Sequence, residues 1–270
     1  MTMENVMCVS YAGGQGKTTM AQALYTILKR NGLDYGLVSA DFIDDSGHSK
    51  LGKLFPGVTD EYGIGAELTA ARHSNNPNAP LRYWDKFGYI LLKGGHIIDI
   101  GANVFPSLST WSLDRSIYKI LEKKNAPALD LFAVTKAEQH SVQNLKQLIK
   151  TITSEQILRL NRIVIVRNEA AGSFDGISFD DIQKEVDAEF VFLDVPRCYS
   201  EIWEELEKKM VPFDSILDKD EDEIVSLLDV DVFTAASGKS QIEEWLDELE
   251  KRLMDAQLLV LEEPQKDAAE

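Results

Sequence analysis

A glycine-rich run near the amino end constrains this chain more than any other feature. The run is Ala12-Gly13-Gly14-Gln15-Gly16-Lys17-Thr18-Thr19, which follows an apolar segment at 6–10 and precedes a segment of helical period that stops at Gly32. A glycine-rich turn between a buried strand and a helix exposes successive backbone N–H groups, and the helix N-terminus adds partial positive charge. This context predicts a phosphate-binding loop rather than a chance glycine-rich turn.

The side chains that end the run fit the same chemistry. Lys17 can reach the β- and γ-phosphates of a nucleotide, and the Thr18 hydroxyl can bind Mg²⁺. Thr19 can reach the side of the α-phosphate. We therefore expect Gly13, Gly14, Gln15 and Gly16, together with these three residues, to form the binding site of a Mg²⁺–nucleotide complex.

Two aspartates follow apolar strands further along the chain. Asp99 ends the run 97–99, where a carboxylate can hold Mg²⁺ through a water, although an acid after a strand is otherwise most often a helix cap. Asp41 ends the second expected strand, which we place beside the first. From there it can reach the γ-phosphate and orient or polarise the attacking water, since phosphoryl transfer depends mostly on positioning and charge stabilisation.

Strand-length apolar runs alternate with stretches of helical period, which predicts an α/β fold with a parallel sheet flanked by helices. We expect a long switch-like loop at 42–80, with a single helix near 64–73, and a helix at 113–123. A further helix presents Val142, Leu145 and Leu148 on one face. The expected strands lie at 6–10, 35–40, 97–101, 129–134, 163–166 and 190–193.

The acidity of the chain is concentrated in its last part. Residues 201–270 carry 22 acidic and seven basic side chains, which accounts for −15 of the formal charge of −17. An apolar stripe from Ile242 to Leu253 and the capping-box spacing of Ser240 and Glu243 predict a helix there. We expect a P-loop domain at 1–200 and an acidic helical extension at 201–270, either packed on the domain or projecting as a docking face.

Charge and hydropathy also limit the functions to consider. An acidic extension repels phosphate backbones and anionic lipid, so strong direct binding to DNA or membrane is not expected. No apolar run reaches the roughly 18–20 residues that span a bilayer, and we expect no secretion signal. Cys8 and Cys198 lack a CxxC partner, so two reduced thiols and a cytoplasmic location are expected.

Taken together, these blocks resemble the ParA/MinD family of deviant Walker-motif ATPases. The resemblance covers roughly residues 5–197 and is carried by the glycine-rich run, Ala40-Asp41, the segment 97–99 and Arg167-Asn168. It implies a parallel sheet with flanking helices and face-to-face dimers around two ATP molecules. It also implies slow hydrolysis that a partner protein stimulates.

The resemblance also implies roles for individual residues. Lys17 would be the P-loop lysine, Thr18 a metal ligand, and Asp41 the hydrolytic aspartate. Asp99 would be the Walker B acid. Asn168 falls where the family reads adenine, and the segment at Pro196 would pack on the base.

Three positions depart from the family pattern. Ala12 stands where the family places a lysine that crosses the dimer, Tyr11 replaces the first glycine of the ordinary Walker A pattern, and Ser39 replaces an aspartate. These departures put the trans-lysine chemistry in doubt. Lys136 is one candidate substitute, although a solvated lysine is the simpler interpretation of it.

The run Thr135-Lys136-Ala137-Glu138 superficially resembles the guanine-reading TKxD sequence of related GTPases. It follows the fourth expected strand, one strand too early for that role, so the base-reading position falls to Arg167-Asn168 and ATP is favoured over GTP. Within the family, the sequence is most similar to the plasmid-borne StbB and TraL type of ParA-related ATPase.

Three functions remain open from the sequence. The first is an ATP switch that acts in plasmid partition, conjugation or cargo positioning, through a partner such as a DNA-binding adaptor. The second is a metabolic P-loop kinase or ligase, which would need acceptor-binding groups in 42–80 or 103–112. The third is a non-hydrolysing nucleotide-binding scaffold, which Tyr11 and Ala12 suggest and which Asp41 and Asp99 argue against.

Overall fold

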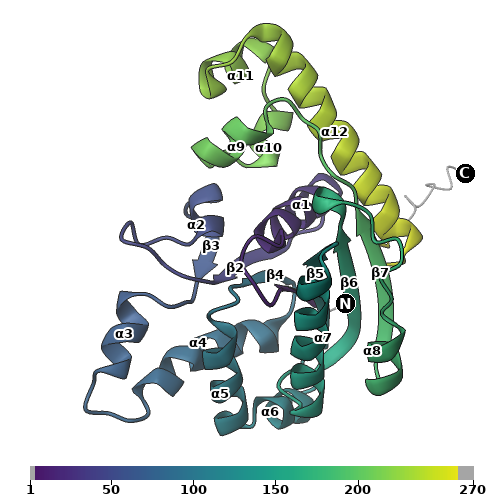
Figure 1. Ribbon diagram of the computed structural model, residues 1–270. Helices are drawn as coiled ribbons and strands as arrows, with labels where there is room; N and C mark the ends of the chain where they lie inside the picture. The colour runs from purple at the N-terminus through teal and green to yellow at the C-terminus, as the bar shows by residue number, and fades with distance from the viewer. Residues whose placement is uncertain (1–3, 261–270) are drawn as a thin grey trace, which may run out of the picture.

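The computed structural model describes residues 4–260, which form a seven-stranded, all-parallel sheet covered by helices on both faces (Figure 1). The strand order is β3-β2-β4-β1-β5-β6-β7. The strands are β1 Asn5–Val9, β2 Gly36–Ala40, β3 Thr59–Glu61, β4 His96–Ile100, β5 Leu129–Lys136, β6 Leu160–Asn168 and β7 Glu189–Val195.

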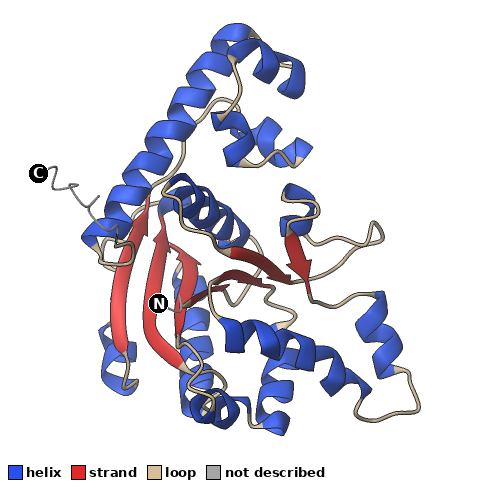
Figure 2. Ribbon diagram, turned by 180° about the vertical axis from the view of Figure 1, so that it is seen from behind, coloured by secondary structure: helices blue, strands red, loops and turns tan. Residues whose placement is uncertain are grey.

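The helices divide into two layers, one on each face of the sheet. The first layer comprises α3 to α8 and the second α1, α2 and α9 to α12, as Figure 2 shows from behind. Their bounds are α1 Lys17–Arg30, α2 Lys50–Leu54, α3 Ala66–Arg72, α4 Ala79–Lys93, α5 Phe105–Arg115, α6 Ile117–Lys123, α7 Gln139–Ser154, α8 Asp180–Glu185, α9 Trp203–Lys209, α10 Phe213–Leu217, α11 Glu221–Leu228 and α12 Val232–Asp255.

The apolar runs form strands because both faces of a parallel sheet are buried. All five residues of β4 are buried, and so are all but the last of the eight residues of β5. Amphipathic helices such as α4 and α7 then cover the sheet with their apolar faces. The predicted three-layer α/β fold with a helical, acidic C-terminal extension is confirmed.

The prediction that the second strand lies beside the first is wrong. Strand β4 lies between β2 and β1 and pairs with both, with Cys8 opposite Asp99 and Ser39 opposite Asp99. The fully buried, apolar β4 occupies this inner position, whereas the other neighbour of β2 is the three-residue polar edge strand β3. Asp41 is therefore one strand further from the glycine-rich loop than we expected.

The segment expected to be mostly loop contains more structure than predicted. Residues 42–80 hold α2 and the edge strand β3 in addition to α3, which matches the single helix expected there. Helix α4 begins at Ala79, inside the expected loop, and continues to Lys93 through residues for which no element was predicted. The short α2 and β3 lack the length over which a hydrophobic period can be recognised.

Two helix predictions also need correction. The expected helix at 113–123 is two helices, α5 and α6, that meet at Ser116 in a left-handed backbone conformation with φ of 53°. Ser240 does not cap a helix, because it lies inside α12, whose N-cap is Asp231. A capping box is present instead at α11, between Asp220 and Glu223.

The acidic C-terminal helices contribute to the second layer of the core. The stripe that contains Ile242, Leu246 and Leu249 is buried against the sheet and α1. Arg30 at the end of α1 forms ion pairs with Asp247 and Glu250 of α12. Within residues 4–260, no helix is both long and apolar enough to cross a membrane.

Candidate functional site

The glycine-rich loop leaves the central strand β1 and leads directly into α1. Strand order reverses around β1, since β4 and β5 lie on its two sides and the chain visits them later. In open α/β sheets, ligands bind at such a point, beyond the carboxyl ends of the strands. Gly16 caps α1 with φ of 100°, a conformation that L side chains rarely adopt, so the loop needs glycine there.

Two hydrogen bonds to Gln15 hold the loop on the sheet. The Asn168 Nδ2 atom donates to the Gln15 carbonyl at 2.8 Å, and the Lys136 N–H donates to Gln15 Oε1 at 3.0 Å. A Cβ atom on Gly16 would collide with Asn168 Nδ2. The ends of β5 and β6 therefore fix the shape of the loop through Gln15 and Gly16.

Thr18 and Asp99 meet directly below the loop. The Thr18 hydroxyl donates to Asp99 Oδ2 at 2.6 Å, and Asp99 is buried, with 1% of its surface exposed. Burial raises the pKa of Asp99 to about 6, and Lys17 and the Thr18 hydrogen bond oppose this effect. Asp99 Oδ1 is also buried and has no hydrogen-bond partner among the described residues. A buried carboxylate oxygen without a partner is an open ligand position.

Asp41 lies beside Asp99, although it comes from a strand that is not adjacent to β1. Its negative charge contributes to the raised pKa of Asp99, after the larger effect of burial. Asp41 Oδ1 accepts the Phe42 N–H at 2.7 Å, and a Cβ atom on Gly101 would collide with the Asp41 carboxylate. The close approach of Gly101 thus holds Asp41 at the carboxyl edge of the sheet.

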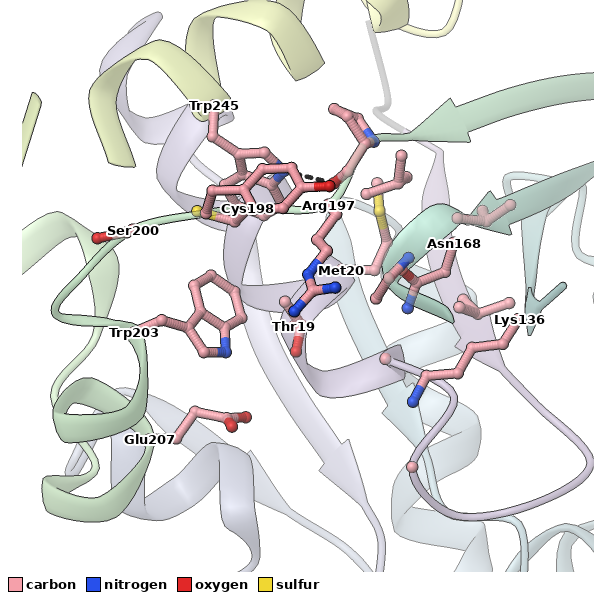
Figure 3. Close-up of a pocket in the computed structure, with 18 of the residues that line it drawn as sticks. Thr19, Met20, Lys136, Asn168, Arg197, Cys198, Ser200, Trp203, Glu207 and Trp245 are labelled. Carbon is pink, nitrogen blue, oxygen red and sulfur yellow. Dashed lines mark hydrogen bonds between the residues drawn. The ribbon is translucent and has the colours of Figure 1, made fainter. Parts of the chain in front are cut away.

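A cavity of about 450 Å³ adjoins the loop, which is a volume typical of small-molecule sites. Figure 3 shows the side chain of Arg197 extending toward Thr19, with Trp203 and Glu207 on one side and Asn168 and Lys136 on the other. Its other lining residues include Gly14, Gly16, Met20, Pro196, Cys198, Tyr199 and Trp245.

The wall opposite the loop is aromatic and rigid. The rings of Trp203, Phe213 and Trp245 pack together with centroid separations of 5.4 to 5.8 Å. The indole N–H of Trp245 donates to the Pro196 carbonyl at 2.8 Å, which fixes the segment after β7 against α12. The cavity is therefore closed by the C-terminal helices as well as by the sheet.

The structure brings together most of the residues that the sequence singled out. Gly14, Gly16, Thr19, Asn168 and Pro196 line the cavity, while Lys17, Thr18, Asp41 and Asp99 gather at the adjoining end of the loop. Gly13 and Gly14 have open space where a Cβ atom would be, and Gln15 is buried because its amide holds the loop.

Two candidate residues differ from their expected places. Arg167 is not part of the cavity wall, because its guanidinium donates to Asp194 at 2.6 Å and lies over the Phe192 ring. Lys136 does line the cavity, beside Asn168. The base-reading role that we expected at the end of β6 can thus belong to Asn168 alone.

Several cavity residues were missed by the sequence analysis. Arg197 and Tyr199 directly follow Pro196, so the segment after the last strand was the available signal for them. Trp203 and Glu207 lie on α9, and no motif marks them. Trp245 was noticed only as part of an apolar stripe, because its indole serves both the core and the cavity wall.

The residues present fit a Mg²⁺ ion. Hydroxyl and carboxylate oxygens are the ligands that this hard cation prefers, and Mg²⁺ sites in phosphate-binding proteins use one or two carboxylates together with phosphate oxygens. Thr18 and Asp99 supply such oxygens, and the unpartnered Asp99 Oδ1 supports the fit. Among residues 4–260, no group of three or more His, Cys, Asp or Glu side chains is placed to hold a metal without such help.

The buried position of Asp99 predicts a pH-dependent stability. The folded protein keeps the Asp99 proton up to about pH 6, whereas an ordinary aspartate releases it near pH 3.8. The folded state therefore binds more protons between these values, and the free energy of unfolding falls as pH rises through this window. At 1.36 kcal/mol per pH unit, the free energy of unfolding is about 3 kcal/mol lower above pH 6 than below pH 3.8. We expect Asp99→Asn to be more stable than the wild type by up to that amount at pH 8.

The measurement is urea denaturation in EDTA at pH 4, 6 and 8. The two proteins should be similar in stability at pH 4 and diverge as pH rises, because asparagine does not titrate. A difference that is the same at all three pH values would show that the Asp99 proton does not cause it.

Of the comparisons with known proteins, the one with solved structures gave matches. No protein-family model and no curated protein matches the sequence. Solved structures with a similar backbone include a ParA family ATPase from Chlorobium tepidum TLS, at 18% identity over 96% of this chain and 98% of that one, with a TM-score of 0.47. The MinD cell division protein of Aquifex aeolicus is similar at 14% identity over 92% of this chain and 97% of that one, with a TM-score of 0.46.

A third similar structure is a nucleotide-binding protein in complex with ADP from Archaeoglobus fulgidus. It is 11% identical over 91% of both chains, with a TM-score of 0.37.

Proposed function

We propose that this chain binds ATP with Mg²⁺, hydrolyses it slowly and acts as a molecular switch of the ParA/MinD type. The observation that carries the proposal is the Thr18–Asp99 hydrogen bond of 2.6 Å, formed under a glycine-rich loop that borders a cavity of about 450 Å³. A hydroxyl and a buried carboxylate at this place are the groups that a Mg²⁺–triphosphate site requires.

The loop would bind the phosphates through its backbone. The N–H groups of residues 13–19 and the positive end of α1 suit an anionic ligand. Lys17 is the only charged side chain between Ser10 and Thr19 and is 7% exposed, so its ammonium is the main local cation available to the β- and γ-phosphates. Thr19 would contact the side of the α-phosphate.

Thr18 and Asp99 would hold the Mg²⁺ ion. When bound, the ion would neutralise part of the negative charge of the phosphates. Because carboxylate ligands bind a cation in their deprotonated form, Asp99 must lose its proton for this role.

The cavity would hold the nucleoside. Asn168 uses one amide N–H for the Gln15 carbonyl and accepts the Ala170 N–H at 3.1 Å, so one N–H and one lone pair remain for a base. Pro196 and Trp203 offer apolar and aromatic surfaces on which a base can pack. The residue at the end of β6 is an asparagine rather than a carboxylate, so ATP is favoured over GTP.

Asp41 would act in hydrolysis. It lies at the carboxyl edge of the sheet next to Asp99, on the side where the terminal phosphate would lie. From there its carboxylate would orient the attacking water by accepting a hydrogen bond from it.

The switch would operate through assembly in the cytoplasm. We propose that residues 1–200 form the ATPase domain, that residues 201–270 form an acidic extension, and that ATP promotes a homodimer. A partner protein, such as a DNA-binding adaptor, would then couple the chain to plasmid partition, conjugation or cargo positioning. The net charge of −17 is unfavourable for direct binding to DNA or anionic membranes.

Size analysis with nucleotides tests this function. We expect multi-angle light scattering to give a monomer with MgADP and a dimer with Mg²⁺ and a non-hydrolysable ATP analogue. EDTA should abolish the dimer, because the triphosphate would lose its metal. A folded monomer under every condition would contradict the switch, and failure to bind any nucleotide would contradict the site assignment as well.

A further inference from the structure

A lysine outside the loop lies over the phosphate end of the site. Lys50 is the first residue of α2, and its side chain lines a small cavity of about 20 Å³ together with Thr18, Thr19 and Gln22 at the start of α1. Lys50 reaches this place from the segment that follows Asp41. Nothing in the sequence around Lys50 marked it as a candidate.

Lys50 is paired with a residue of the C-terminal extension. Its Nζ atom donates to Glu207 Oε1 of α9 at 3.3 Å, and Glu207 lines both this small cavity and the large one. The ion pair thus connects the segment after β2 with the extension, next to Thr18 and Thr19. In Figure 1, α9 lies above α2, and α1 lies to the right of α2.

The field of Lys50 reaches the centre of the site. Burial is the main cause of the raised pKa of Asp99, and Lys50 is among the groups that act against it, after Lys17 and the Thr18 hydrogen bond. The ammonium of Lys50 is therefore close enough to the Thr18–Asp99 pair to stabilise negative charge there.

Several negatively charged side chains lie at this end of the site. Asp41, Asp99 and Glu207 bring three carboxylates to the region where a terminal phosphate would lie. The loop itself supplies only Lys17. Lys50 adds a cation beside Thr18, whereas the side chain of Arg197 extends toward Thr19 from the segment after β7.

The pair with Glu207 is weak enough to be exchanged. Its two side chains are 45% and 51% exposed, and solvent-exposed pairs of this kind contribute little to stability. A charge-assisted hydrogen bond to phosphate is stronger than such a pair. A triphosphate can therefore draw Lys50 away from Glu207.

We propose that Lys50 binds the terminal phosphate of a nucleoside triphosphate within the same chain and exchanges Glu207 for that phosphate when the triphosphate binds. This inference rests on the proposed function, since it requires a nucleotide in the phosphate loop. It makes Lys50 a residue that distinguishes triphosphate from diphosphate. It also couples the nucleotide state to the contact between α2 and α9.

The test is isothermal titration calorimetry with MgATP and with MgADP. A non-hydrolysable ATP analogue, titrated in parallel, controls for hydrolysis. We expect Lys50→Ala to weaken the binding of the triphosphate by about tenfold or more and the binding of MgADP by less than about twofold. Lys50→Arg should retain most of the triphosphate affinity. Lys53→Ala is the matched control, because Lys53 lies on the same helix and pairs with Asp44 instead.

Glu207→Gln gives a second, independent readout. Without the competing carboxylate, triphosphate affinity should rise about twofold or more while MgADP affinity stays unchanged. If the pair has only a structural role, both substitutions should weaken the binding of the two nucleotides equally.

Three results would overturn the proposal and would locate the error. Equal losses for the two nucleotides, or values like those of Lys53→Ala, refute the role of Lys50 while leaving nucleotide binding intact. Weaker triphosphate binding by Glu207→Gln refutes the exchange. Failure of the folded wild type to bind either nucleotide refutes the proposed function and this inference together.

Discussion

Lys17→Met is expected to weaken MgATP binding by about 100-fold or more. The substitution keeps an apolar stem of similar length and removes the ammonium, so the phosphates lose a charge-assisted hydrogen bond and the nearest cation. Since every 1.4 kcal/mol is a factor of ten in affinity, the loss corresponds to roughly 3 kcal/mol. Titration of a fluorescent ATP analogue measures it directly.

The effect of Lys17→Met has to be separated from a loss of folding. Lys17 is buried and its charge opposes the raised pKa of Asp99, so the variant should be compared with the wild type by circular dichroism and urea denaturation. Lys53→Met is a control on a partly exposed lysine outside the loop. A folded Lys17→Met protein that binds MgATP with wild-type affinity would show that the loop is not the phosphate site.

Asp41→Ala is expected to slow ATP hydrolysis by about 100-fold while changing MgATP affinity less than about threefold. A positioned carboxylate that assists proton transfer or orients water typically contributes 10²–10⁴-fold to a rate. The Asp41 carboxylate is held at the sheet edge by Phe42 and Gly101, and neither contact belongs to the phosphate loop. Single-turnover hydrolysis and the lifetime of the ATP-bound state are the measurements.

Asp45→Ala provides the control for Asp41→Ala, because Asp45 is an exposed aspartate of the same segment. An ATP-bound state no longer-lived than that of the wild type would contradict the assignment of Asp41 to hydrolysis. A large loss of MgATP affinity would instead assign Asp41 to binding.

Sequence patterns predicted the parts of the fold that depend on local order. The phosphate loop was visible because glycines, lysine and threonines are consecutive between an apolar strand and an amphipathic helix. The long helices with sustained period, such as α1 and α7, were predicted for the same reason. Asp99 was recognisable because it is the one acidic residue in the otherwise apolar run 97–100, near the end of β4.

The rest of the site depends on contacts between distant segments. Lys50 and Glu207 are 157 residues apart in the chain, and no period or motif links them. The order of the sheet was likewise not visible, because β1, β2 and β4 have similar apolar sequences and only pairing places β4 between the other two. The role of Asn168 in holding Gln15 is also a product of strand register, since β6 carries Asn168 alongside Lys136 at the end of β5.

The long helix α12 connects the nucleotide-side cavity with the opposite edge of the sheet. At 1.5 Å per residue, the part of α12 from Trp245 to Leu253 extends for about 12 Å. Trp245 stands at the cavity wall, while Leu253 lies near Arg162 and the starts of the strands, where Arg162 donates to the Gln257 carbonyl at 3.1 Å. A regular helix moves as a rigid body, so a shift of the aromatic wall that tilts α12 would also displace its far end. Spectroscopic labels near that end would thus report on the cavity without touching it.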